Sequence, residues 1–141
     1  SNLLSDLIME QYGWMQERGI TPVLSISDGI IIEGNTVYVA RIIQNLFSNA
    51  EKYAVRHMGV TLVETDKSVE LSVFNDTDDE TDIYADRVFD PFYKPVSRKK
   101  GGSGLGLYVV KCLCEKLGAR VTADIDIEGR FSIAIIFPLN R

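Results

Sequence analysis

The chain has 141 residues, of which 45% are hydrophobic and 25% are charged, as expected for one soluble globular domain with its own core. Its 15 basic and 20 acidic side chains give a net charge of −5, which argues against a general binder of nucleic acid or of anionic membranes. No apolar stretch approaches the roughly 18 residues that span a bilayer, and no signal peptide is visible.

The first half of the chain predicts a helix, a hairpin and a longer helix. Apolar residues at near-helical spacing predict the first helix over 3–18, which Gly19 ends. Apolar runs at 22–26 and 30–33 flank a Ser-Asp-Gly turn, which is a hairpin signal. A second helical pattern follows over 36–53. Its expected core face consists of Val39, Ile42, Ile43, Leu46, Ala50 and Tyr53.

The second half predicts two hairpins, separated by a long polar segment and a helix. The expected strands are 59–64, 69–74, 120–127 and 130–137. The polar segment 76–101 is long for a connection in a compact domain, so we expect a functional, mobile lid there. Residues 104–117 predict a helix. Its expected inward residues are Leu105, Val109, Cys112, Leu113 and Leu117.

These elements predict an α/β (α+β) fold in a single domain over 1–141. Helices that alternate with hairpin strands favour a two-layer sandwich, with about three helices on one mixed sheet of about five strands. Cys112 and Cys114 are the only cysteines, and their spacing directs them to different sides of a helix. We therefore expect free thiols in a reducing compartment rather than a disulfide.

A glycine-rich loop, Gly-Gly-Ser-Gly-Leu-Gly at 101–106, runs directly into the helical pattern that follows it. Glycines let a ligand approach the backbone closely, and a helix N-terminus favours anions. A P-loop ends in Gly-Lys-Ser/Thr, and a dinucleotide fingerprint has Gly-x-Gly-x-x-Gly after a strand; neither pattern is present here. The loop therefore predicts a nucleotide site of another kind.

Asn45, Asn49 and Lys52 share one stripe of the helix 36–53, because their spacing is i, i+4 and i+7. An amide carbonyl is an oxygen ligand that suits Mg²⁺, which keeps several waters when it is bound with phosphates. The alternative is a polar helix surface without a role. With the glycine loop in the same chain, we interpret Asn49 as a Mg²⁺ ligand and Lys52 as a phosphate contact. Asn45, one turn before Asn49, would support the metal as a possible second ligand or orient a water.

Three ordered motifs and the final strand resemble one family. Residues 45–53 are similar to its N box, 88–94 to its F box, 102–107 to its second glycine box, and 131–139 to its last strand. The family is the ATP-binding catalytic domain of bacterial sensor histidine kinases, within the gyrase, chaperone and mismatch-repair ATPase superfamily. The resemblance implies a Bergerat-type fold that binds ATP and Mg²⁺. It also implies a γ-phosphate donated to a histidine on a separate dimerisation helix, a response-regulator partner, and a cytoplasmic domain whose parent protein is anchored in the bacterial inner membrane.

The same resemblance implies the individual site residues. Asn45 and Lys94 are the expected catalytic residues, and the basic lid side chains are expected to clamp phosphates unless they form only a solvated loop. Tyr53 either contacts phosphate or ribose or only caps the core, whereas Phe89 and Phe92 are expected to anchor the lid. The expected nucleotide-binding residues are Asn49, Lys52, Tyr53, Asn75, Asp76, Arg98, Lys100, Gly102, Gly104, Leu105, Gly106 and Leu107.

The first glycine box departs from the family pattern Asp-x-Gly-x-Gly. Counting back from the F box places Asn75 where the family has the aspartate that accepts the adenine amino group, and places Thr77 and Asp79 at the two glycines. An asparagine carbonyl still accepts this hydrogen bond, but side chains in place of glycine reduce the room beside the base. An alternative alignment puts Asp76 in the adenine role.

The altered box leaves other functions open. One alternative is a degenerate nucleotide-binding module with a regulatory or scaffold role and weak or no ATP binding. Another is an anti-sigma-type kinase that phosphorylates serine, although the F box favours the histidine-kinase branch. His57, the only histidine, lies outside any His-Glu phosphoacceptor pattern.

We expect a dissociation constant for ATP of roughly tens of micromolar or weaker, with poor discrimination against GTP.

Overall fold

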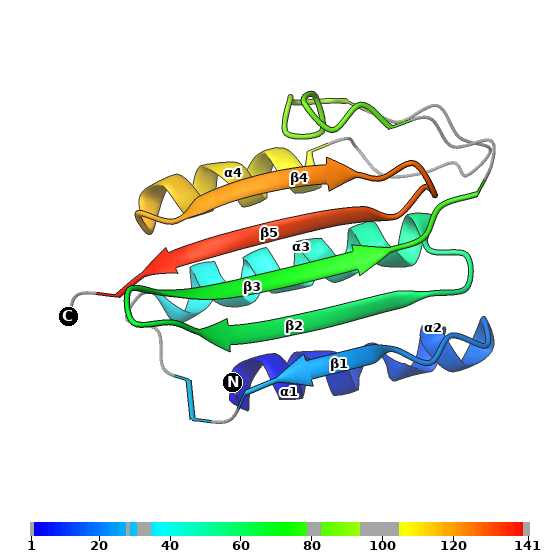
Figure 1. The fold of residues 1–141 in the computed structure, drawn as a ribbon, viewed down its shortest axis with the longest axis horizontal. Coiled ribbons are helices and arrows are strands. Elements are labelled where there is room, and N and C mark those ends of the chain that lie inside the picture. The colour runs from blue at the N-terminus through cyan, green and yellow to red at the C-terminus, as the bar shows by residue number, and fades with distance from the viewer. Residues whose placement is uncertain (1, 28, 31–34, 79–82, 94–104, 140–141) are drawn as a thin grey trace.

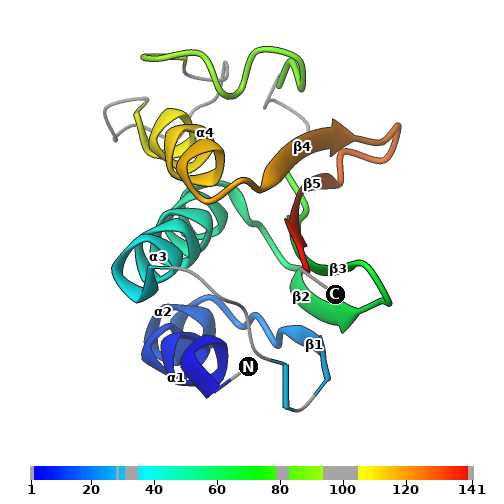
Figure 2. The same ribbon diagram turned by 90° about the vertical axis from the view of Figure 1, so that its left-hand side faces the viewer.

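The computed structural model describes residues 2–27, 29–30, 35–78, 83–93 and 105–139. Helices cover one face of a five-stranded sheet, so the molecule has two layers (Figures 1 and 2). The helices are α1 (Asn2–Glu10), α2 (Tyr12–Glu17), α3 (Thr36–Tyr53) and α4 (Gly106–Lys116). The strands are β1 (Val23–Ile26), β2 (Met58–Glu64), β3 (Ser68–Asn75), β4 (Arg120–Ile125) and β5 (Phe131–Pro138). This arrangement confirms the predicted fold class. None of the described helices has the length and apolar character needed to cross a membrane.

The sheet is mixed, in the order β1-β2-β3-β5-β4. The predicted hairpins are confirmed as the antiparallel pairs β2–β3 and β4–β5, and β3–β5 is antiparallel as well. β1 pairs with β2 in parallel, which requires a crossover connection, and α3 supplies it. β1 is the edge strand of the described sheet, so its pairing with β2 does not test the predicted hairpin between 22–26 and 30–33. Apart from Ile30, its second arm lies outside the described residues.

The N-terminal helix predicted over 3–18 is divided into α1 and α2 at Gln11. The Gln11 amide donates to the Ile8 carbonyl at 2.9 Å, so the chain makes a tighter turn at this point before the helix resumes. The predicted end at Gly19 is confirmed, since Gly19 adopts a φ of 70°, a conformation that glycine reaches without steric cost. Both helices lie on the same layer as α3 (Figure 2).

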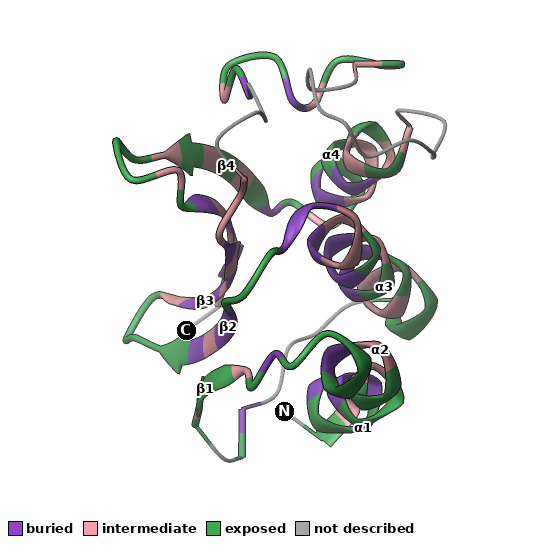
Figure 3. Ribbon diagram, turned by 90° about the vertical axis from the view of Figure 1, so that its right-hand side faces the viewer, coloured by how far each residue is buried: buried purple, intermediate pink, exposed green. Residues whose placement is uncertain are grey.

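α3 begins and ends within a residue of the prediction because its first turn carries a strong cap. The Asn35 side chain accepts hydrogen bonds from the amides of Val37 and Tyr38 at 2.9 and 3.2 Å. Its predicted core residues are buried, except that Val39 is half-buried, and Phe47 joins them with its surface fully covered. The buried sides of α3 and of the sheet face one another (Figure 3).

α4 is rotated by about one residue, roughly 100°, from the prediction. Val110 and Cys114 are its buried residues, whereas Val109 and Cys112 are half-buried. The apolar residues of this helix cover more than half of its circumference, so periodicity alone does not decide which side faces the core. Both cysteines are free, as expected. Burial, assisted by Glu115, raises the pKa of the Cys114 thiol to about 12, which keeps that thiol protonated and unreactive.

Gly59 is required where β2 passes beneath an aromatic ring of β3. A Cβ atom at this position would lie 2.2 Å from the Phe74 ring and 2.8 Å from the Val23 carbonyl oxygen. We expect Gly59→Ala to lower the free energy of unfolding by about 1–3 kcal/mol, because backbone and ring must move apart. Urea unfolding measures the change. Gly13→Ala is the control, because a Cβ atom there meets nothing within 4 Å and alanine favours the helix. A Gly59→Ala variant with the same free energy of unfolding as the parent would contradict the close approach.

Candidate functional site

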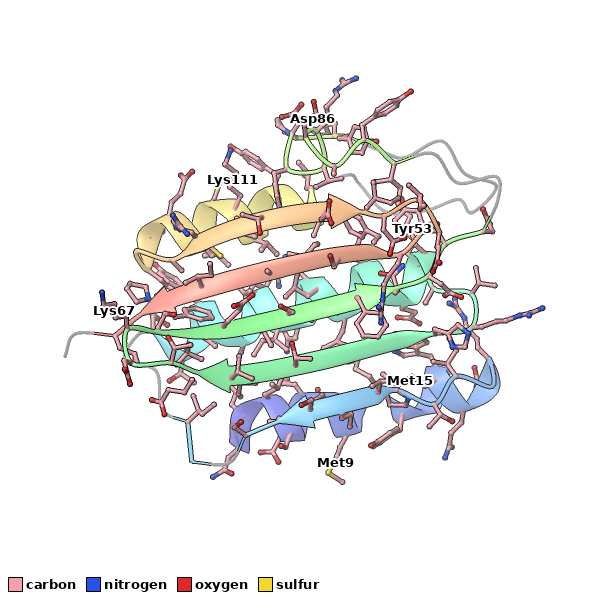
Figure 4. The ribbon with its side chains drawn as sticks, viewed as in Figure 1. Met9, Met15, Tyr53, Lys67, Asp86 and Lys111 are labelled. Carbon is pink, nitrogen blue, oxygen red and sulfur yellow. The ribbon has the colours of Figure 1, made fainter. Side chains whose placement is uncertain are left out.

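The predicted site residues that the structure describes lie toward one end of the sandwich. The C-terminal half of α3, the N-terminus of α4, the end of β3 and the described lid residues 83–93 meet there (Figure 1). Tyr53, in the last turn of α3, marks this end in Figure 4. The N-box stripe, the first glycine box and the start of the helix after the second glycine box are therefore neighbours in space, although they are far apart in the chain.

Asn45 joins α3 to α4 directly. Its Nδ2 donates a hydrogen bond to the Gly106 carbonyl at 3.1 Å, across 61 positions of sequence. Because the amide nitrogen is used in this contact, the Oδ1 oxygen remains the acceptor of the side chain. The contact brings a predicted metal-supporting amide to the first turn of α4, the end of a helix where anions are favoured.

Asn49 and Lys52 continue the stripe toward the end of α3, and both are half-buried. The Lys52 Nζ atom lies 5.2 Å from the centroid of the Tyr53 ring, a cation–π distance. An amide oxygen and an ammonium group on one stripe fit a metal-bound phosphate chain, since the metal prefers oxygen ligands and the phosphate prefers a cation. The donor set therefore suits a nucleotide with Mg²⁺.

Tyr53 is buried, with 5% of its surface exposed. Burial raises the pKa of its hydroxyl above the usual value, and the nearby Tyr93 of the lid raises it further. The phenol thus stays neutral and able to donate a hydrogen bond. Of the two roles left open by the sequence, burial favours core packing for the ring, and the cation–π contact places that ring beside Lys52.

Asn75 ends β3 as the one buried polar side chain among the described residues, with 2% of its surface exposed. Its Nδ2 donates to the Asp76 carbonyl at 2.7 Å. This bond fixes the orientation of the amide, so that Oδ1 is the atom that a ligand amino group would meet. A buried, oriented acceptor at the end of a strand fits the adenine contact that we expected of this residue.

Asp76, the alternative adenine acceptor, is engaged elsewhere. Its carboxylate accepts hydrogen bonds from the amides of Val55, Arg56 and His57 at 2.8 to 3.1 Å, and so it holds the loop between α3 and β2. Partial burial acts to raise its pKa, but these backbone hydrogen bonds outweigh burial and lower the pKa below the usual value. The sequence spacing gave no sign of this anchoring role, because the three donors precede Asp76 by about twenty positions.

Replacing Asp76 with alanine is expected to lower the free energy of unfolding at neutral pH by about 1–2 kcal/mol, as for a lost helix cap. The lowered pKa means that the folded chain prefers the charged carboxylate. The stabilisation is therefore present above the ordinary aspartate pKa and is lost as pH falls through the folded-state pKa. Urea unfolding of parent and variant should differ at neutral pH and converge below that pKa. Asp66→Ala is the control, because Asp66 is an exposed aspartate in the β2–β3 turn. A difference in unfolding free energy between the parent and the Asp76 variant that does not change with pH would contradict the assignment.

Thr77, at the first lost glycine of the box, is hydrogen-bonded to a neighbouring hairpin. Its Oγ1 donates to the Gly129 carbonyl at 2.8 Å, in the turn between β4 and β5. We had expected side chains in this box to reduce the room beside the base. The threonine ties the box to that hairpin, and the reduced room beside the base stays a prediction. Asp79, at the second glycine position, lies outside the described residues.

The aromatic residues that anchor the described part of the lid, Phe89 and Tyr93, differ from the expected pair. Phe89 packs against the core, as predicted, but Phe92 has 70% of its surface exposed and a φ of 65°. The prediction that Phe92 anchors the lid is therefore wrong. Val88 is buried in its place, and the Tyr93 hydroxyl accepts a hydrogen bond from the Tyr84 amide at 2.8 Å, which closes the 84–93 loop.

Several predicted site residues lie outside the described part of the chain. These are Lys94, Arg98, Lys100, Gly102 and Gly104, and the prediction of a mobile lid over 76–101 also falls largely on them. Of the second glycine box, the described residues are Leu105, Gly106 and Leu107. Leu105 is the N-cap of α4, and Leu107 packs against the core.

Comparisons with known proteins bear on the family and the fold of the chain. Residues 34–141 match the family described as histidine kinase-, DNA gyrase B-, and HSP90-like ATPase. Sensor histidine kinase YcbM of Bacillus subtilis is 32% identical over 123 residues, which are 83% of this chain and 40% of that protein. The chain thus spans less than half the length of this relative.

Two solved structures show the same fold. The mycobacterial sensor histidine kinase MprB has a TM-score of 0.79 at 23% identity, over 95% of this chain and 94% of that one. Full-length ShkA, solved in complex with AMPPNP, has a TM-score of 0.79 at 22% identity, over 97% of this chain and 29% of that one. At these identities the likeness concerns the fold.

Proposed function

The chain belongs to the histidine kinase-, DNA gyrase B- and HSP90-like ATPase family, and we propose that it is the ATP-binding catalytic domain of a sensor histidine kinase. The observation that carries the proposal is the Asn45–Gly106 hydrogen bond, because it joins the amide stripe of α3 to the start of the helix that follows the glycine loop. The sensor-kinase name of the relative reported above supports the histidine-kinase branch of the family.

In this proposal each residue of the stripe has one task. The Asn49 carbonyl holds Mg²⁺, Asn45 supports the metal or orients a water, and Lys52 contacts a phosphate. The Asn75 Oδ1 accepts a hydrogen bond from the adenine amino group. When bound, ATP with Mg²⁺ supplies the transferable γ-phosphate.

The remaining residues bind and neutralise the phosphates. Lys94, Arg98 and Lys100 supply positive charge, and the main chain at 102–107 supplies N–H groups. None of the proposed site residues is an obvious general base, so the chain acts by positioning and by charge neutralisation, as is usual in phosphoryl transfer.

The acceptor and the partners lie outside this chain. We propose that the γ-phosphate is transferred to a histidine on a dimerisation helix of the same protein and then to a response regulator. The parent protein is proposed to be a sensor anchored in the bacterial inner membrane, with this domain in the cytoplasm. These proposals rest on the description of YcbM as a sensor histidine kinase, of which the chain matches 40%.

Titration with a fluorescent ATP analogue, with and without Mg²⁺, tests the proposal. We expect saturable binding that Mg²⁺ strengthens and that unlabelled ATP reverses. Binding that is indifferent to Mg²⁺ would contradict the metal assignment. The absence of binding to any nucleotide would favour the alternative of a degenerate regulatory module.

A further inference from the structure

We infer that Arg18 is a positioning residue of the nucleotide site, although it lies outside the residues that match the ATPase family and touches no proposed ligand group. Its guanidinium Nη1 donates hydrogen bonds to the main-chain carbonyls of Glu51 and Ala54, the latter at 3.3 Å. The inference rests on the function proposed above, because it concerns the same site.

The two carbonyls that Arg18 binds enclose the site residues at the end of α3. Lys52 and Tyr53 are the only residues between Glu51 and Ala54, so one guanidinium holds the main chain on both sides of them. The last carbonyls of a helix have no partners within the helix, and this end of the helix carries a partial negative charge. A cation with two donors therefore satisfies both needs of the final turn.

Arg18 itself is held in a fixed place. It is the C-cap of α2, and the next two residues close the helix through hydrogen bonds from Gly19 to Gln16 at 3.1 Å and from Ile20 to Met15 at 2.8 Å. This pattern, with Gly19 at a φ of 70°, is a Schellman motif, and its apolar ends, Met15 and Ile20, are both buried.

The Arg18 side chain is guided by its own helix as well. Its Cζ atom lies 5.4 Å from the centroid of the Trp14 ring, and the Trp14 indole donates to the Gln11 Oε1 at 2.9 Å. α2 and the end of α3 lie at the same end of the molecule, where Figure 4 labels Met15 and Tyr53. The N-terminal helices thus contact, through Arg18, the turn that carries Lys52.

This contact makes the position of Lys52 depend on α2. Without the guanidinium, the hydrogen bonds from Arg18 to Glu51 and Ala54 are lost, and the final turn frays first because its own hydrogen bonds are the last of the helix. The ammonium group of Lys52 then spends less time where a phosphate would meet it. The effect on binding should therefore act through Lys52, and it should disappear when Lys52 has no charge.

A double-mutant cycle on the whole chain tests this inference. ATP–Mg²⁺ affinity is measured for the parent, Arg18→Ala, Lys52→Met and the double variant, with the melting temperature of each. We expect Arg18→Ala to weaken binding about fivefold in the parent and to have almost no effect in Lys52→Met. Arg18→Lys, which keeps the charge with fewer fixed donors, should give an intermediate loss and provides a second variant if Arg18→Ala fails to fold.

Lys116→Ala is the matched control. Lys116 is also a cation in the last turn of a helix and also lies over an aromatic ring, 5.7 Å from the Tyr38 centroid. The end of α4 lies at the opposite end of the sandwich from the end of α3 (Figure 1), so this variant should bind nucleotide as the parent does.

The outcomes separate this inference from the proposed function. Equal affinity of Arg18→Ala and the parent would overturn the inference and leave the proposed function standing. An equal loss in both backgrounds, with a lower melting temperature, would show a general structural role and would also overturn it. If the parent binds no nucleotide while it remains folded, the proposed function is wrong and the inference falls with it.

Discussion

Replacing Asn49 with alanine is expected to abolish the Mg²⁺-dependent part of nucleotide affinity while the domain stays folded. Asn49 is half-buried on the stripe that includes Asn45 and Lys52, and its amide oxygen is the proposed metal ligand. Mg²⁺ bound to phosphates needs few protein ligands, so loss of one removes most of what the protein contributes. The increase in affinity on adding Mg²⁺ should fall by roughly tenfold or more in the variant.

The stability of the Asn49→Ala variant should change little, because alanine favours a helix and the side chain is not part of the buried core. Isothermal titration with ATP, with and without Mg²⁺, gives the affinities, and a melting curve checks the fold. Gln44→Ala is the matched control, since Gln44 is an exposed amide on the same helix but outside the stripe. Equal Mg²⁺ dependence in Asn49→Ala and the parent would rule out the ligand assignment.

Local signals in the sequence were enough for most of the secondary structure. α3 was predicted within a residue because Asn35 is a strong cap and the apolar pattern is regular. The hairpins β2–β3 and β4–β5 have short turns, so each pairing is nearly local. β1 is different, because its described partner is β2, which follows only after the whole of α3. Nothing local in the 22–26 segment distinguishes a parallel partner from a hairpin partner.

The placement of some candidate site residues was predictable, but their contacts were not. Spacing alone placed Asn45, Asn49 and Lys52 on one stripe, because helical periodicity is strict. The exposed position of Phe92 was missed, because an aromatic residue in a predicted lid motif suggests packing regardless of its backbone conformation. The roles of Asp76 and Arg18 were also missed. Both act on main-chain groups about twenty to thirty-six positions away, and main-chain partners leave no trace in side-chain patterns.

The identity of residue 75 is expected to set adenine selectivity. Asn75 is buried, and its amide is held by the Asp76 carbonyl so that Oδ1 is the available acceptor. A hydrogen bond to a charged acceptor contributes about 1.5–3 kcal/mol, against roughly 1 kcal/mol for a neutral one. Asn75→Asp should therefore raise ATP affinity on the order of tenfold. GTP should gain little, because guanine presents an oxygen acceptor where adenine presents the amino group.

The gain in affinity should come with a loss of stability. The variant carboxylate has no N–H to donate to the Asp76 carbonyl, and it places a buried charge beside a second carboxylate. Asn75→Asp should therefore melt at a lower temperature than the parent without nucleotide, and saturating ATP should recover part of the difference. This opposition between binding and folding separates a direct contact with adenine from a general tightening of the domain, which would raise affinity and stability together.

Thr77→Gly restores a family residue in the same box and is the matched control for Asn75→Asp. Because this variant loses the hydrogen bond from the Thr77 hydroxyl to the Gly129 carbonyl and keeps the acceptor at residue 75, it should lose stability without gaining affinity for either nucleotide. Parallel titrations of the three proteins with ATP and GTP give the comparison. A strong preference for ATP in the parent that Asn75→Asp leaves unchanged would mean that another residue accepts the adenine amino group. A gain for Thr77→Gly as large as that for Asn75→Asp would mean that room beside the base, rather than the acceptor, limits binding.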